Sequence, residues 1–107
     1  MNIVKRPTVE YYKKVFPEAA TALEDWYDQF KRANFNTPQE LKSVYRSASI
    51  VGSSRVVFNI HGNDYRLVIK IRYEFGIAYI IWFGTHKEYD DINVETISFD
   101  QALIQRK

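Results

Sequence analysis

The chain has 107 residues, of which 46% are hydrophobic and 26% are charged, and this length suits one globular domain with one core. It has no cysteine, which excludes disulfides, thiolate catalysis and cysteine-ligated zinc. The first ten residues lack an apolar export core, and the longest apolar run, Ile77–Phe83, is too short to span a bilayer. We therefore expect a cytoplasmic protein that forms a single domain over residues 1–107 and makes no use of a membrane.

The net charge is only +2, but the charges are distributed unevenly along the chain. Residues 42–87 contain seven Lys or Arg residues and two acidic residues, whereas residues 88–107 contain two basic and five acidic residues. Such asymmetry indicates a basic working surface beside an acidic end.

The first half of the chain is predicted to be helical. Thr8 is a candidate N-cap for a first helix, and Pro17 ends that helix and is a suitable first residue for a second one that runs to about Ala33. Apolar residues recur at helical spacing along both segments, which gives each helix an apolar face. Thr37-Pro38-Gln39-Glu40 is a capping box, and it predicts a third, short helix through about Tyr45.

The second half is predicted to form strands. Residues 47–54 are small and polar, and they favour a loop or a weak edge strand. Arg55–Ile60 and Tyr65–Tyr73 flank the turn sequence His61-Gly62-Asn63-Asp64, in which Gly and Asn can take positive φ. After a further turn, Ile77–Thr85 is apolar on both faces, as in a buried central strand. We expect an α+β fold with N-terminal helices packed on one face of a small antiparallel sheet.

The strand Tyr65–Tyr73 has a row of cations on one face. Its side chains alternate between the two faces, so Arg66, Val68, Lys70 and Arg72 lie together, with alternate residues about 6.6–6.8 Å apart. This spacing is close to the phosphate repeat of an extended nucleic-acid strand, and we interpret the row as phosphate-binding. An open, solvated sheet face is the alternative interpretation of the same pattern.

The apolar strand ends in Thr85-His86-Lys87-Glu88-Tyr89-Asp90, a segment rich in proton-transfer groups. His is the usual general acid or base at neutral pH, and Tyr89 can donate a proton or stack on a base. The alternative is a solvated strand end that leads into a short helix capped by Thr85. No phosphate-binding loop, nucleophile elbow or HExxH motif is present, and the two His residues are not at metal-ligand spacing. We expect no metal and no cofactor.

The turn between the first two strands adds further polar groups. Asn59 and Asn63 can hydrogen-bond the edges of bases, although their turn-forming tendency explains them as well. His61 is interpreted as a turn residue without a chemical role.

Two motifs carry a resemblance to a known family. The chain resembles the HigB-type toxins of bacterial type II toxin–antitoxin systems, within the RelE-like group of mRNA interferases. The likeness is carried by VFNIHGNDYRLV (Val57–Val68) and THKEYD (Thr85–Asp90), and it extends over about residues 7–92. His61 stands where relatives are expected to have a small residue, and the likeness says nothing of the tail after Asn93.

The resemblance implies a RelE-like fold and endonucleolytic cleavage of mRNA, usually on the ribosome. It also implies neutralisation by a HigA-type antitoxin with a helix-turn-helix domain, and contact with operator DNA only through that antitoxin.

The residues and the resemblance together predict metal-independent RNA cleavage by attack of a 2′-hydroxyl on the adjacent phosphate. His86 or Lys87 is the expected base, Arg66 stabilises the extra phosphate charge, and Tyr89 orients the substrate or donates the proton. The further residues expected to bind RNA are Asn59, Asn63, Lys70, Arg72 and Thr85. The alternatives are a non-catalytic RNA-binding module and a protein-interaction domain with a basic docking face.

Overall fold

The computed structural model describes residues 1–52 and 54–98. In chain order the elements are β1 (Asn2–Val4), α1 (Arg6–Val15), the 3-10 turn η1 (Pro17–Ala19), α2 (Ala20–Arg32), α3 (Pro38–Val44), β2 (Ser49–Val51), β3 (Arg55–Ile60), β4 (Tyr65–Arg72), the 3-10 turn η2 (Tyr73–Phe75), β5 (Ile77–Thr85) and α4 (His86–Tyr89). None of the helices in this part of the chain has the length and hydrophobicity needed to cross a membrane.

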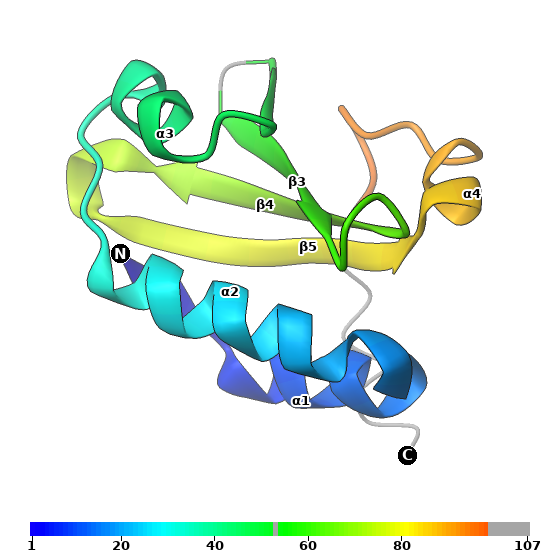
Figure 1. Ribbon diagram of the computed structural model, residues 1–107. Coiled ribbons are helices and arrows are strands. Elements are labelled where there is room, and N and C mark those ends of the chain that lie inside the picture. The colour runs from blue at the N-terminus through cyan, green and yellow to red at the C-terminus, as the bar shows by residue number, and fades with distance from the viewer. Residues whose placement is uncertain (53, 99–107) are drawn as a thin grey trace.

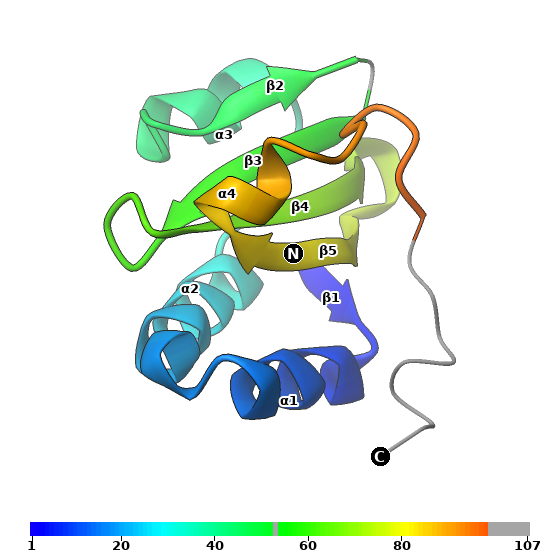
Figure 2. The same ribbon diagram turned by 90° about the vertical axis from the view of Figure 1, so that its right-hand side faces the viewer.

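Within the described residues the strands form one sheet in the order β1-β5-β4-β3-β2. Strands β2 to β5 are antiparallel neighbours, and β1 pairs with β5 in parallel. Helices α1 and α2 lie against one face (Figure 1), and α4 lies on the other side of the sheet (Figure 2). The predicted α+β layout is confirmed. The parallel edge strand was not predicted, because three residues are too few to show a period of two.

The core lies between the sheet and α1 and α2. Leu67, Ile69 and Ile71 of β4 face the helices and are fully buried, as their alternation predicts. Trp26 and Phe30 of α2 stack with ring centroids 5.0 Å apart, and both rings contact Phe58 of β3. Trp26 and Phe30 are therefore core residues on the apolar face that the helical spacing predicts.

The helix starts differ in part from the prediction. Helix α1 begins at Arg6, because Pro7 fits the first turn and the Lys5 carbonyl accepts from the Thr8 amide at 3.0 Å. Thr8 is thus buried inside the helix, and its assignment as the N-cap is wrong. Thr37 does cap α3 and accepts from the Glu40 amide at 3.2 Å, but Glu40 accepts from the Asn36 amide at 2.9 Å and not from Thr37.

A β-bulge in β5 changes which of its side chains share a face. Val68 lies opposite Trp82 and Ile69 lies opposite Ile80, so Ile81 is one extra residue on β5. Tyr79 and Trp82 are three residues apart and would face opposite sides of a regular strand. Because of the bulge, both lie on the face that is turned away from α1 and α2, which we call the open face.

An ion-pair cluster joins α1 to α2. Arg6 and Lys13 of α1 donate to Glu24 of α2, with distances of 2.6 Å from Arg6 Nη2 and 2.8 Å from Lys13 Nζ to Glu24 Oε1. The hydrogen bonds from Arg6, and then the one from Lys13, lower the pKa of Glu24 from 4.5 to about 2. A carboxylate whose pKa is lower in the folded chain stabilises the fold above its unfolded pKa and loses this effect as the pH falls.

We expect Glu24→Gln to lower the stability at pH 7 by about 0.5–1 kcal/mol, the range for partly exposed ion pairs. It should also flatten the decline of the melting temperature between pH 4.5 and pH 2, since the titrating group is gone. Thermal unfolding monitored by circular dichroism across this pH range measures both effects. Glu10→Gln, at the exposed edge of the cluster, is the control, and equal flattening in both variants would contradict the assignment to Glu24.

Candidate active site

Three segments meet at one end of the sheet: the turn between β3 and β4, the end of β5, and α4 (Figure 1). The His86 amide donates to the Asp64 carbonyl at 2.8 Å, which ties the start of α4 to the turn. Tyr65 lies opposite Thr85 in the sheet, and Arg66 lies opposite Gly84. The structure therefore brings the two predicted motifs, Asn59–Arg66 and Thr85–Asp90, together at the same end of the molecule.

Arg66 is fixed by neutral oxygen atoms. Its Nη2 donates to Asn63 Oδ1 at 2.8 Å, and its Nη1 lies 3.2 Å from the Asn63 carbonyl and 3.1 Å from the Tyr65 carbonyl. No carboxylate in residues 1–52 and 54–98 forms an ion pair with Arg66. The guanidinium is held in place while its charge stays available for an anion.

Asn59 and Asn63 lie beside this guanidinium in different ways. Asn59 is exposed and is the cross-strand neighbour of Arg66, so both side chains are on the open face. Asn63 anchors Arg66, as its hydrogen bond shows. The positive φ of this turn is taken by His61 (56°) and Gly62 (66°) and not by Asn63, and His61 contacts Asp64 at 3.1 Å within the same turn. His61 is thus the turn residue that the sequence predicted.

A capping box builds the start of α4. The Thr85 side chain accepts from the Glu88 amide at 3.0 Å, and Glu88 accepts from the Thr85 amide at 2.9 Å. The short helix capped by Thr85, which the sequence offered as an alternative interpretation of this segment, is therefore present. The cap also orients the catalytic candidates, because His86 and Lys87 are the first two residues of the helix.

His86 and Lys87 are both exposed to solvent. His86 Nε2 lies 3.8 Å from Asp90 Oδ1, one helical turn further on. In the described residues, no three His, Asp or Glu side chains come together as metal ligands would.

Tyr89 lies against an aromatic residue that the sequence analysis did not select. The ring centroids of Tyr89 and Trp82 are 6.3 Å apart. A Cβ atom on Gly84 would lie 2.6 Å from Trp82 Cη2 and 2.8 Å from Glu88 Oε1, so the indole crosses over the glycine. Residues 82–85 pair regularly with β4, so alternation places Trp82 on the open face together with Gly84.

Lys70 and Arg72 share the open face with Arg66, but they are separated from it. Val68, between Arg66 and Lys70, has no exposed surface, and its neighbour Val57 on β3 is 3% exposed. On the same face, Arg55 Nη1 donates to the carbonyls of Val94 at 3.0 Å and Ile97 at 2.7 Å, which holds the segment after α4 over the sheet. The predicted row of cations is therefore divided into two parts.

A profile of the HigB toxin family, described as the RelE-like toxic component of a toxin–antitoxin system, matches residues 19–92. The chain belongs to this family. The match runs from the start of α2 to just beyond α4, so it includes every residue that the sequence selected for the site. The resemblance inferred from the two motifs is confirmed.

Curated relatives agree with this assignment. The chain is 28% identical to the mRNA interferase toxin HigB of Escherichia coli strain K12 over 92 residues, which cover 84% of this chain and 88% of the relative. The mRNA interferase HigB of Shigella flexneri has the same identity and coverage. The mRNA interferase HigB of Escherichia coli O6:H1 strain CFT073 is 23% identical over 94 residues, with coverages of 86% and 91%.

We expect Gly84→Ala to destabilise the fold by about 1–3 kcal/mol, because the new methyl group overlaps the Trp82 ring and the capping carboxylate. Trp82→Leu in the same chain should remove most of this penalty, so the two substitutions should be strongly non-additive. Urea unfolding of both single variants and the double variant measures the coupling. Additive effects would show that the indole is not what excludes a side chain at position 84.

Proposed function

We propose that this member of the HigB toxin family is an endoribonuclease that cleaves mRNA on the ribosome without a metal ion, by attack of a 2′-hydroxyl on the adjacent phosphate. The names of its relatives support RNA cleavage. The observation that carries the proposal is the joining of α4 to the β3–β4 turn, with a positioned guanidinium and an imidazole at the same end of the sheet.

Arg66 is the proposed stabiliser of the phosphorane. The attack adds negative charge to the phosphate oxygens, and a fixed cation without a carboxylate partner stabilises that charge without first having to reorganise. Asn63 positions this group, and the exposed amide of Asn59 lies beside it for the substrate. Arg66 is therefore catalytic in this proposal, Asn59 binds RNA, and Asn63 positions Arg66.

His86 is the proposed base that takes the proton from the 2′-hydroxyl. Its ring is exposed at the start of α4, with the Asp90 carboxylate 3.8 Å from Nε2, and an imidazole is the usual general base at neutral pH. Lys87 has no comparable carboxylate partner among the described residues, so its role is to bind phosphate. Tyr89 protonates the departing 5′ oxygen or stacks on the substrate. Thr85 contributes by capping α4, which positions His86 and Lys87.

Neutralisation by an antitoxin follows from the family to which the chain belongs. We propose that the antitoxin is of the HigA type, with a helix-turn-helix domain through which alone the pair contacts operator DNA. We also propose that residues 1–107 act as one toxin domain in the cytoplasm. Co-expression with the protein encoded beside this chain, followed by purification of a stable complex, tests the partner.

The mechanism requires the 2′-hydroxyl of the nucleotide on the 5′ side of the scissile bond. We expect an oligonucleotide with a single 2′-deoxy sugar at that position to be cut elsewhere but not there, since the nucleophile is missing. Mapping of the 5′ ends after incubation with purified ribosomes and with ribosome-free RNA measures the cleavage and its dependence on the ribosome. Cleavage at the deoxy position would exclude this mechanism.

The roles of the side chains are tested by His86→Ala and Arg66→Ala. We expect the cleavage rate to fall by about 10²–10⁴-fold for His86→Ala and about 10²–10³-fold for Arg66→Ala, with melting temperatures near that of the parent. Lys87→Ala is the matched control, because it removes a neighbouring exposed side chain of α4. A larger loss for Lys87→Ala than for His86→Ala would transfer the role of base to Lys87.

A non-catalytic RNA-binding module makes a different prediction for the same variants. The parent would bind RNA with strong dependence on salt, but no concentration of it would produce new RNA ends. A protein-interaction domain with a basic docking face would show neither cleavage nor salt-dependent RNA binding.

A further inference from the structure

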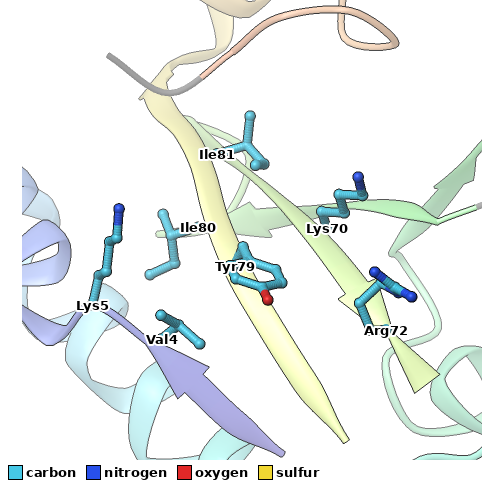
Figure 3. A pocket seen from close by; sticks show the side chains of 7 residues that line it. All are labelled: Val4, Lys5, Lys70, Arg72, Tyr79, Ile80 and Ile81. Carbon is cyan, nitrogen blue, oxygen red and sulfur yellow. The ribbon is translucent and has the colours of Figure 1, made fainter. Parts of the chain in front are cut away.

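A hollow lies on the open face, at the end of β4 and β5 that is far from α4. Its volume is about 320 Å³, within the range of about 300–1,000 Å³ that is usual for small-molecule sites. Figure 3 shows Lys70 and Arg72 on one side of the Tyr79 ring, and Val4 and Lys5 on the other.

Strand pairing places these side chains together. Lys70 of β4 is the cross-strand neighbour of Tyr79, and Arg72 follows on the same face of β4. On the other side, Val4 of β1 pairs with Tyr79. Tyr79 is 38% exposed although β5 is not an edge strand of the sheet. It is therefore a flat aromatic surface between Lys70 and Arg72 on one side and the Val4–Lys5 edge on the other.

Lys70 and Arg72, the cations on one side of this ring, are poorly compensated. Within the described residues, Lys70 forms no ion pair and the Tyr79 hydroxyl has no hydrogen-bond partner. Arg72 lies 3.4 Å from the exposed carboxylate of Glu74, and its guanidinium lies over the Phe75 ring at 5.4 Å. An ion pair this exposed is weak, so an arriving phosphate can replace it.

We propose that this hollow is a second RNA subsite, in which a base of the substrate stacks on Tyr79 while Lys70 and Arg72 hold a neighbouring phosphate. Stacking of a base on an aromatic ring beside cations is the general way in which proteins bind single-stranded nucleic acid. The proposal rests on the proposed function, because it places the substrate of that site on a second surface.

The distance between the two ends fits a short length of RNA. Arg66 and Lys70 are four residues apart on β4, which is about 13 Å, or about two phosphate repeats of an extended strand. An RNA strand cannot run straight along β4 from Arg66 to Lys70, because Val68 is buried between them and the segment held by Arg55 covers the sheet there. The RNA can instead pass over β5, because Trp82 shares the open face with Tyr79 and Ile81 lines the hollow.

The test measures binding in the His86→Ala background, so that the RNA stays intact. Fluorescein-labelled single-stranded RNA of two and of six nucleotides is titrated, and anisotropy gives the affinity. The six-nucleotide RNA can reach both ends of the face, whereas the dinucleotide cannot. We expect Tyr79→Ala to weaken the longer RNA by about 10-fold or more, and to weaken the dinucleotide less, because the dinucleotide can still bind at the end of the face that carries Arg66.

Tyr79→Phe is the matched control, because it keeps the ring and removes only the hydroxyl; its affinity should stay within about two-fold of the parent. Lys70→Gln should weaken the longer RNA and lower the dependence of binding on salt by about one unit of slope. Circular dichroism of each variant verifies folding. In the cleaving parent background, Tyr79→Ala should raise KM and leave kcat nearly unchanged.

Equal affinity of Tyr79→Ala and the parent for the six-nucleotide RNA would overturn the subsite, even if cleavage by the parent upholds the proposed function. Binding that depends on Tyr79 in a protein that never cleaves RNA would uphold the subsite and refute the proposed function. Loss of binding to the purified antitoxin, with RNA affinity unchanged, would assign the hollow to the protein partner and overturn the proposal.

Discussion

The candidate site depends on how the start of α4 is attached to the β3–β4 turn. The hydrogen bond from the His86 amide to the Asp64 carbonyl and the pairing of Tyr65 with Thr85 connect segments about twenty residues apart in sequence. Tyr65 also stacks on Phe83 with ring centroids 5.5 Å apart, and its hydroxyl donates to Glu18 of η1, between α1 and α2. This hydrogen bond raises the pKa of Tyr65 to about 12, so Tyr65 keeps its proton and the contact at any physiological pH.

The consequence is that the catalytic candidates stand on rigid supports and still face solvent. Arg66 is on a central strand and is held by Asn63. His86 begins a helix whose capping box has both of its hydrogen bonds, between Thr85 and Glu88. Helix α4 has only four residues and would not be stable alone. Its position comes from the capping box, the turn and the Trp82 ring. A group that must meet a phosphate within a fraction of an ångström benefits from such support.

The sequence was sufficient for the elements with strong local signals. The strands Arg55–Ile60 and Ile77–Thr85 have the predicted bounds, and the division of β4 into an apolar and a basic face follows directly from its alternation. The motif spacing also led to the family. Asn2–Val4 and the N-cap at Lys5 could not be predicted, because the first is stabilised by a partner more than seventy residues away and the second by backbone geometry alone.

The arrangement of the site was harder to predict from the sequence, for a related physical reason. Periodicity assumes a regular strand, and the extra residue at Ile81 reverses the facing of the side chains on one side of it. Tyr79 therefore shares the open face with Trp82, and the need for Gly84 becomes visible only once the indole is placed over it. Alternation likewise placed Val68 correctly among the cations, but it did not show that this position is completely buried.

The uneven charge of the chain takes on a specific meaning in three dimensions. The acidic segment after α4 lies over the basic face, yet the contact that holds it there uses the carbonyls of Val94 and Ile97, which accept from Arg55. Neutral oxygens also hold Arg66. Within the described residues, the acidic end thus shields the middle of the face without neutralising the cations on either side of it. A carboxylate in place of the carbonyls that hold Arg55 or Arg66 would lower the affinity of the open face for phosphate. A carbonyl fixes the guanidinium and leaves its charge available to the substrate.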